Sequence, residues 1–140
     1  QVERLYIYNR TLERARGLVD YMRRYFEDTE ISVLESVEDI SDEKLDLIVN
    51  GTSCGMKLDD PFPINPDILN YTSRYYDLIY SPSETKMMQK AAEYGVDVAG
   101  GIGMLIRQAV ISHRFWFPDA KKDELYNIMS EAYLKWTGSL

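Results

Sequence analysis

Short runs of apolar residues, without alternating polar positions, recur along this chain of 140 residues. The first run covers Leu5–Tyr8 and stops at Asn9. A run of this length predicts a β-strand that is buried on both faces, and such strands are typical of parallel sheets. The other predicted strands cover Ile31–Leu34, Leu45–Val49, Tyr75–Tyr80 and Val96–Ala99.

Amphipathic segments separate these predicted strands. After the first strand, apolar residues recur at the three-to-four spacing of a helix face, so we expect a helix that begins at Thr11 and ends near Asp28. Its apolar positions are Ala15, Leu18, Val19 and Met22. Further helices are predicted over Thr85–Tyr94, Met104–Phe117 and Lys122–Trp136, with short helical turns at Ser41–Lys44 and Pro66. Strands that alternate with helices predict an α/β fold with a parallel sheet.

The charge balance and the single cysteine limit the classes of function. The chain has 16 lysine and arginine residues against 23 aspartate and glutamate residues, for a formal net charge of −7 at pH 7. Because nucleic acids are bound by clustered cations, we do not expect this chain to bind them. No segment of the sequence reaches the roughly 18 to 20 apolar residues of a membrane helix. Cys54 alone can form no internal disulfide, so the cytoplasm is the simplest compartment.

Hydrolytic and metal chemistry are not indicated. His113 is the only histidine, and one histidine with one cysteine gives no metal-ligand spacing. A nucleophile–histidine pair would have to combine His113 with Cys54 or with a serine that no nucleophile-elbow motif marks. We therefore interpret His113 as structural, and the carboxylate-rich stretch from Glu35 to Glu43 as solvated surface.

Polar residues and glycines follow the predicted strands, where open parallel sheets bind their ligands. Asn9–Thr11 follows the first strand and Asn50–Ser53 follows the third. Tyr80 ends the fourth strand, and Gly100–Gly103 follows the last. Because the carboxyl ends of parallel strands lie at one edge, we expect these residues to form one ligand-binding rim.

The first of these strand ends has a cationic pattern. In dinucleotide-binding folds, an acidic residue at this place holds the ribose 2′-hydroxyl of NAD. Here Asn9 takes that place, with Arg10 beside it and Arg14 one helical turn further on. Because one arginine side chain can bind two phosphate oxygens at once, the pattern points toward the 2′-phosphate of NADP. The alternative is that Thr11 only caps the helix and the arginines form a solvated face.

The glycine cluster after the last strand is a weak motif. Ile106 stands where a pyrophosphate-binding loop has its third glycine, so a close backbone approach to a flat ligand is the better interpretation. The helix that follows has Met104 and Gln108 on one face, which places an apolar group next to an amide. On spacing alone, Met104 is more often a core residue, and Tyr80 can equally be a packed aromatic residue.

Taken in order, four motifs resemble the C-terminal, NADP-binding half of the shikimate dehydrogenase family over nearly the whole chain. The motifs are Asn9–Thr11 with Arg14, Asn50–Met56, Asp77–Tyr80, and Gly101–Leu105 with Gln108–Ala109. The family usually has Asn-Ala-Thr-Ser in the second motif, so Gly51 is a departure that should loosen this turn. The resemblance implies a three-layer, Rossmann-like parallel sheet.

The resemblance also implies an activity: the reversible, NADP-linked reduction of 3-dehydroshikimate to shikimate in aromatic amino acid biosynthesis. By this likeness, the residues that hold the 2′-phosphate are Asn9, Arg10, Thr11 and Arg14. Thr52 and Ser53 line the adenine and ribose side, and the residues at the nicotinamide end are Leu78, Gly101 and Met104. Tyr80 and Gln108 reach the substrate.

Three family features have no counterpart among the 140 residues: the glycine-rich pyrophosphate turn, the strand before it, and the N-terminal substrate domain with its catalytic lysine and aspartate. We therefore expect residues 1–117 to form a partial NADP-binding domain, and residues 118–140 a helix that packs on the absent N-terminal half. In the strand order 3-2-1-4-5-6, the absent first strand lies between the strands that end at Asn9 and Asn50.

Other functions stay open at this point. A quinate dehydrogenase, or an enzyme of dual specificity, would use the same motifs, and Tyr80 and Gln108 do not decide between them. A nucleotide-binding module without catalysis is a third hypothesis. The sequence also leaves open whether the protein forms a homodimer.

Overall fold

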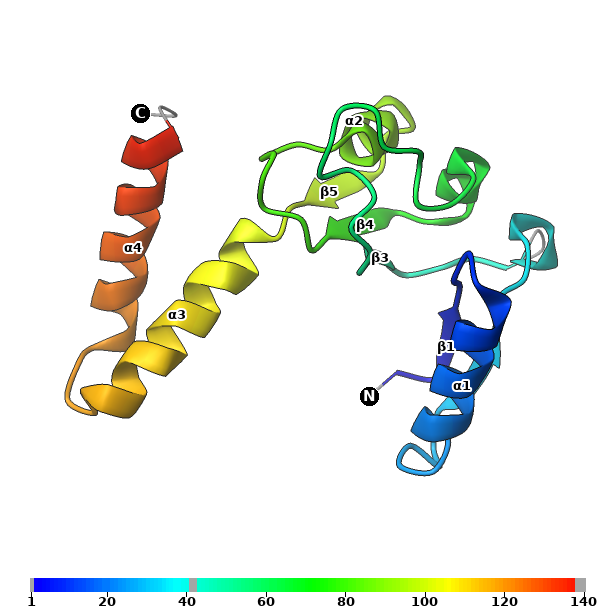
Figure 1. Ribbon diagram of the computed structural model, residues 1–140, viewed down its shortest axis with the longest axis horizontal. Coiled ribbons are helices and arrows are strands. Elements are labelled where there is room, and N and C mark those ends of the chain that lie inside the picture. The colour runs from blue at the N-terminus through cyan, green and yellow to red at the C-terminus, as the bar shows by residue number, and fades with distance from the viewer. Residues whose placement is uncertain (1, 41–42, 138–140) are drawn as a thin grey trace. The chain divides into compact units, whose positions relative to one another are not determined.

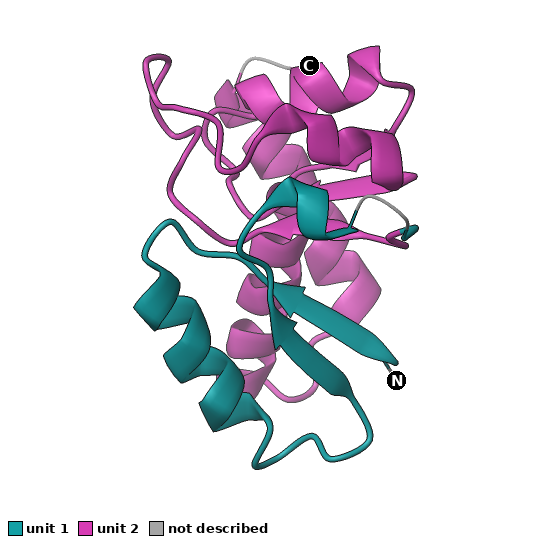
Figure 2. Cartoon of the chain, turned by 90° about the vertical axis from the view of Figure 1, so that its right-hand side faces the viewer, with its two compact units in different colours: residues 1–44 teal, residues 45–140 magenta. Residues whose placement is uncertain are grey.

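A computed structural model describes residues 2–40 and 43–137 of the chain (Figure 1). The chain divides into two compact units, Gln1–Lys44 and Leu45–Leu140, which we call unit 1 and unit 2 (Figure 2). Within the described ranges, none of the helices has both the length and the apolar character that crossing a membrane requires.

Unit 1 is a strand–helix–strand unit. The strand β1 (Arg4–Ile7) pairs in parallel with β2 (Glu30–Val33), with Arg4 opposite Glu30, and α1 (Leu12–Met22) connects them. A short 3-10 helix, η1 (Val37–Ile40), follows β2. Burial of one side of α1 against the strands supplies the core, which contains Ala15, Val19, Ile31, Leu34, Val37 and Ile40.

The helix α1 is shorter than the sequence pattern predicts. It ends at Met22 rather than near Asp28, and Leu18, predicted to face the core, is 47% exposed. The chain has to reverse before β2 starts, and the side chain of Arg23 stabilises this reversal, because its Nε donates to the backbone carbonyl of Ile31 at 2.8 Å. The predicted turn at Ser41–Lys44 includes residues 41–42, which lie outside the described residues.

Unit 2 contains a three-stranded parallel sheet in the order β3-β4-β5. Its strands are β3 (Ile48–Asn50), β4 (Arg74–Asp77) and β5 (Asp97–Ala99), and its helical elements are η2 (Pro66–Tyr71), α2 (Lys86–Glu93), α3 (Ile102–Trp116) and α4 (Lys122–Thr137). The predicted α/β fold with parallel strands is therefore confirmed.

The strand boundaries differ most from the prediction at the end of β4 and at the start of β3. The strand β4 ends at Asp77, because the Asp77 carboxylate accepts the backbone N–H of Ile79 at 3.0 Å. The strand β3 starts at Ile48, and Leu45 makes only an isolated parallel bridge with Thr72.

The pairing of the strands agrees with the order 3-2-1-4-5-6. In the described part of the chain, β1 pairs only with β2, and β3 pairs only with β4, so each keeps one edge without a partner strand. The expected burial on both faces fails where a strand lies at such an edge. Val49 of β3, for example, is 51% exposed.

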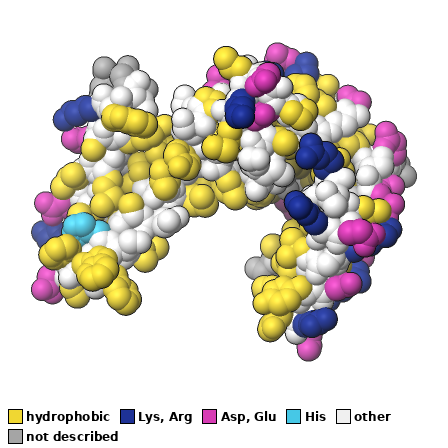
Figure 3. Space-filling view, viewed as in Figure 1, with side chains coloured by type: hydrophobic (Ala, Val, Ile, Leu, Met, Phe, Trp, Pro, Cys, Tyr) yellow, Lys and Arg dark blue, Asp and Glu magenta, His cyan; other side chains and the backbone are white. Residues whose placement is uncertain are grey.

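The helices α3 and α4 pack against each other within unit 2 and carry much exposed apolar surface. Apolar side chains gather over both helices in Figure 3. The large exposed ones include Ile111, Phe115, Trp116, Ile128 and Trp136. No side chain of α4 is fully buried among the described residues.

Gly101 sets how closely α3 approaches the sheet. Its backbone N–H donates to the carbonyl of Ile79 at 3.0 Å, and a side-chain carbon at this position would overlap the carbonyl group of Leu78. Only glycine allows this contact, because the obstacle is backbone and cannot rotate away. The start of α3 is thus held against the end of β4.

We expect Gly101→Ala to lower the free energy of unfolding by about 3 kcal/mol, at the upper end of the cost of overpacking. The matched control is Gly17→Ala in the interior of α1, where a side-chain carbon would meet nothing within 4 Å. That change should raise the free energy of unfolding by about 0.5 to 1 kcal/mol through helix propensity. Urea unfolding of the full chain measures both, and equal effects would contradict the proposed steric role of Gly101.

Candidate functional site

In unit 1, the predicted rim residues lie together where β1 leads into α1. Asn9 Oδ1 accepts the backbone N–H of Thr11 at 2.8 Å, which forms a tight turn before the helix. Thr11 occupies the N-cap position, but its hydroxyl makes no capping hydrogen bond. Thr11 therefore begins the helix by its position alone, and its exposed hydroxyl is not used in capping.

The two arginines of this turn differ from the other arginines of unit 1. Arg10 and Arg14 are exposed, and neither guanidinium has an ion pair or hydrogen bond within the described residues. By contrast, Arg4 pairs with Glu43 at 2.8 Å, and Arg16 is bound by carboxylates on two sides. The turn thus presents two uncompensated positive charges.

The acidic stretch of unit 1 is not entirely solvated surface. Glu43 accepts a hydrogen bond from Tyr6 at 2.6 Å in addition to its ion pair with Arg4. The hydrogen bond to this carboxylate raises the pKa of Tyr6, so its hydroxyl remains a donor. Asp39 also has a local role, because it accepts the backbone N–H groups of Glu35 and Ser36.

In unit 2, the loop that follows β3 is organised by the buried side chain of Asn50. Its Oδ1 accepts both the backbone N–H of Thr52 at 3.0 Å and the Thr52 hydroxyl at 2.7 Å. The Thr52 hydroxyl in turn accepts the N–H of Cys54 at 3.1 Å. Thr52 and Ser53 are exposed at this loop, but the Thr52 hydroxyl is already committed to holding it.

The outer end of the same loop is held by Asp60. Its carboxylate accepts the backbone N–H groups of Gly55 at 3.1 Å and Lys57 at 3.0 Å. These backbone hydrogen bonds hold the pKa of Asp60 below its usual value, so the carboxylate form is the one that stabilises the loop. The loop is therefore fixed at both ends.

A buried network joins this loop to the end of β4. Asp77 is fully buried, and its carboxylate accepts hydrogen bonds from Asn50 Nδ2 at 3.2 Å and from the Thr85 hydroxyl at 2.8 Å. Thr85 is the N-cap of α2. The network thus connects β3, β4 and the start of α2 at the carboxyl edge of the sheet.

The remaining predicted site residues lie at the end of β4 and along α3. Leu78 follows β4 and donates its backbone N–H to the carbonyl of Asn50 at 3.0 Å. Tyr80 is 47% exposed, and its carbonyl accepts the Tyr133 hydroxyl at 3.2 Å. Gln108 is exposed and Met104 is 39% exposed, so the alternative of Met104 as a core residue is wrong.

Sequence reasoning placed Asn50 and Asp77 in motifs and Thr85 at a helix start, but it missed the hydrogen-bond network through which these three residues hold this edge together. The available signal was a polar residue at the end of each of two apolar strands. Because the strand ends pair, with Asn50 opposite Asp77, two such residues on neighbouring parallel strands are expected to meet.

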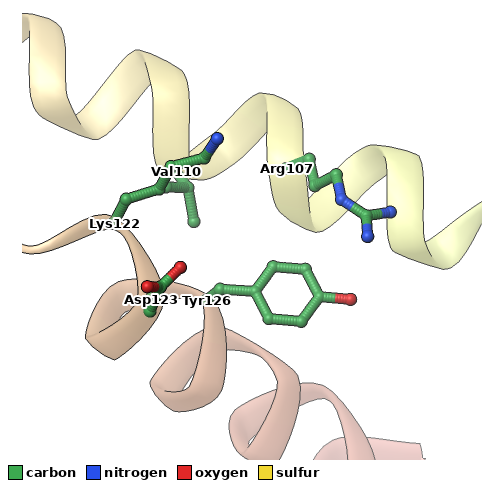
Figure 4. A pocket seen from close by; sticks show the side chains of 5 residues that line it. All are labelled: Arg107, Val110, Lys122, Asp123 and Tyr126. Carbon is green, nitrogen blue, oxygen red and sulfur yellow. The ribbon is translucent and has the colours of Figure 1, made fainter.

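The described pocket lies elsewhere, between α3 and α4, and it is lined by Arg107, Val110, Lys122, Asp123 and Tyr126 (Figure 4). None of the predicted site residues lines it. Its volume of about 200 Å³ is small for a dinucleotide, and the Arg107 guanidinium already lies 5.3 Å from the centre of the Tyr126 ring. The pocket is therefore not a candidate for the cofactor.

His113 on α3 lies against Phe117, with ring centres 4.9 Å apart, and its Nδ1 is buried without a hydrogen-bond partner. Over the described ranges, no group of three or more histidine, cysteine, aspartate or glutamate side chains is arranged to hold a metal ion.

Comparison with known proteins identifies relatives, although no family model matches the chain. The chain is 36% identical over 116 residues to shikimate dehydrogenase (NADP+) of Afipia carboxidovorans, an alignment that covers 83% of this chain and 40% of the relative. The chain thus spans about 40% of the length of this curated relative.

Solved structures are also similar to this chain. The shikimate dehydrogenase of Aquifex aeolicus matches with a TM-score of 0.68 and 29% identity, over 89% of this chain and 43% of that protein. Quinate dehydrogenase of Corynebacterium glutamicum, in complex with NAD, matches with a TM-score of 0.73 and 21% identity, over 92% of this chain and 46% of that protein. The second likeness shows the Rossmann-like fold alone. By sequence similarity over most of its own length, the chain belongs to the shikimate dehydrogenase family.

Proposed function

We propose that this chain is the cofactor-binding part of an NADP-dependent shikimate dehydrogenase, which reversibly reduces 3-dehydroshikimate to shikimate. The observation that carries the proposal is its 36% identity to a relative named shikimate dehydrogenase (NADP+). The two uncompensated arginines at the end of β1 support the choice of NADP over NAD.

The adenosine end of the cofactor would be held by unit 1. Arg10 and Arg14 supply charge for the 2′-phosphate, and Thr11 adds a hydroxyl that no capping hydrogen bond occupies. Asn9 shapes the turn through its hydrogen bond to Thr11. A neutral Asn9 also avoids the repulsion that a carboxylate would exert on a phosphate.

The loop after β3 would contact the adenine and ribose side through Thr52 and Ser53. Because the Thr52 hydroxyl bonds to Asn50, its role would be to shape the loop. Ser53, exposed on this loop, is the residue with a hydroxyl to offer.

The nicotinamide end would lie against Leu78, Gly101 and Met104, with Tyr80 and Gln108 reaching the substrate. NADPH, when bound, supplies the hydride. The protein's residues orient the reacting carbons, and the close packing of Gly101 on Leu78 fixes one wall of that site. The family's catalytic lysine and aspartate have no counterpart in these 140 residues, so this chain alone would be inactive.

We further propose that a strand pairs with the free edges of β1 and β3, and that an N-terminal substrate domain completes the enzyme. The unpaired edges and the 40% coverage of the relative support this. Residues 1–117 would then be the partial NADP-binding domain. Residues 118–140 would pack on the absent half through apolar side chains of α4 such as Ile128 and Trp136.

Two alternatives predict different results. A quinate dehydrogenase shares the fold, so specificity has to be measured. A nucleotide-binding module without catalysis would bind NADPH but turn over neither substrate. The same proposal includes a location in the cytoplasm. It also includes a small molecule as the substrate, and neither nucleic acid nor a membrane as a partner. Assembly as a homodimer is compatible with it.

We expect Arg14→Ala in the full chain to weaken NADPH binding roughly ten- to a hundred-fold, because one charge-assisted contact to the phosphate is lost. Binding of NADH, which lacks the 2′-phosphate, should stay within twofold. Titration of nicotinamide fluorescence measures both affinities. Arg24→Ala is the matched control, because Arg24 is exposed and has no side-chain partner in the described residues. An unmodified chain that prefers NADH would contradict the phosphate-clamp hypothesis.

In the complete enzyme, with its N-terminal domain, we expect Gln108→Ala to raise KM or lower kcat for shikimate about tenfold, with little change in NADPH affinity, because an uncharged hydrogen bond to the substrate is lost. Steady-state rates on shikimate and on quinate, with NADP and with NAD, measure the effect and the specificity together. Gln89→Ala on α2 serves as the control. A loss of NADPH affinity instead would assign Gln108 to the cofactor side.

A further inference from the structure

The family resemblance assigns no role to the buried carboxylate at the end of β4, although Asp77 opens one of its motifs. This carboxylate bonds to Asn50, which precedes the loop after β3, and to the segment that follows β4. Asp77 is 0% exposed, and no lysine or arginine contacts it among the described residues. A buried charge without a cation is costly unless several donors solvate it. The identity of those donors therefore shows what Asp77 holds in place.

Four donors surround the carboxylate. They are the Thr85 hydroxyl at 2.8 Å, the Ile79 backbone N–H at 3.0 Å, the Tyr75 hydroxyl at 3.2 Å and Asn50 Nδ2 at 3.2 Å. Burial and the neighbouring Asp77 carboxylate raise the pKa of Tyr75 well above its usual value, so this hydroxyl stays protonated and donates. All four contacts therefore require an acceptor at position 77.

The contact with Asn50 decides how the loop after β3 is built. A carboxylate can only accept, so it selects the orientation of the Asn50 amide in which the NH₂ group faces Asp77. Asn50 Oδ1 then faces the N–H and the hydroxyl of Thr52, and Nδ2 also reaches the Cys54 carbonyl at 3.2 Å. The reversed amide would place its NH₂ group against the Thr52 N–H, and its oxygen against the Asp77 carboxylate and the Cys54 carbonyl.

The contact with Ile79 acts on the other side of the rim. By accepting the Ile79 N–H, Asp77 ends the ladder of β4 and sets the course of the segment between Leu78 and Tyr80. In the same segment, the Ile79 carbonyl accepts a hydrogen bond from the backbone N–H of Gly101 at 3.0 Å. One carboxylate is thus bonded to the proposed adenosine-side loop, through Asn50, and directly to the proposed nicotinamide-side segment.

We infer that Asp77 is a positioning residue for cofactor binding, which acts by fixing the orientation of the Asn50 amide and thereby the loop that carries Thr52 and Ser53. This inference rests on the proposed function. Asp77 touches neither cofactor nor substrate in this role, so its effect must appear as a change in loop geometry.

The test compares two changes in the network. Asp77→Asn keeps the shape but allows either amide orientation at Asn50, so in the full chain NADPH affinity should fall roughly tenfold. Thr85→Val removes a donor to Asp77 and the cap of α2, but no hydrogen bond to a residue of the loop after β3. It should lower the unfolding midpoint but leave NADPH affinity within twofold. Asp46→Asn, at an exposed aspartate without a side-chain partner in the described residues, is the control for charge.

A second readout does not depend on NADPH. Hydrogen exchange at the Thr52 and Cys54 amides should become roughly tenfold faster in Asp77→Asn, because their acceptors depend on the Asn50 orientation. The Asp97 amide, which bonds to the Ser73 carbonyl, should not change. In an Asn50→Ala background, Asp77→Asn should add no further loss of NADPH affinity, because Asp77 acts on the loop only through the Asn50 amide.

The outcomes separate a positioning role of Asp77 from a merely structural role. If Asp77→Asn and Thr85→Val lose NADPH affinity in proportion to their loss of stability, Asp77 is merely structural and the inference is wrong. Unchanged exchange at Thr52 and Cys54 in Asp77→Asn overturns it as well. If the unmodified full chain binds no NADPH, the proposed function fails, whereas the exchange comparison still decides whether Asp77 orients the loop.

Discussion

The architecture of unit 2 depends on the need to satisfy one buried carboxylate. Asp77 lies where the β4 ladder stops, and its oxygens take hydrogen bonds from a strand, a loop and a helix cap. Leaving any of these donors unpaired in the interior would cost about 1 to 3 kcal/mol each. Polar contacts therefore hold the three elements in one arrangement. The apolar core beside them depends less on exact geometry, because apolar contacts have no fixed direction.

A second constraint, steric rather than polar, acts at the same edge. The absence of a side chain at Gly101 lets the start of α3 rest on the Leu78 carbonyl, while the Gly101 N–H bonds to Ile79. Polar contacts thus orient the segment after β4 from one side, and backbone contact confines it from the other. A short segment held in this way is suited to presenting Leu78 and Tyr80 with little conformational freedom, which is what a site that aligns two reacting carbons requires.

Apolar runs in the sequence predicted the type and order of the strands well, because burial against a sheet leaves a direct trace in residue type. They predicted the ends poorly, because ends are decided by competition from single side chains. Asp77 takes the Ile79 N–H from the sheet, and Arg23 stabilises the turn that shortens α1. Likewise, the sequence indicated that Arg10 and Arg14 are cationic, but only the structure shows that they lack the carboxylate partners that Arg4 and Arg16 have.

This difference between arginines explains how an acidic chain can be suited to an anionic cofactor. The net charge of −7 acts at long range, and at physiological ionic strength it is screened within about 8 Å. Close to the end of β1, the field is set by which charges are paired. Carboxylates neutralise Arg4 and Arg16, whereas Arg10 and Arg14 stay uncompensated and Asn9 adds no negative charge. A phosphate within hydrogen-bonding distance of this turn therefore meets a local positive charge, whatever the sign of the whole chain.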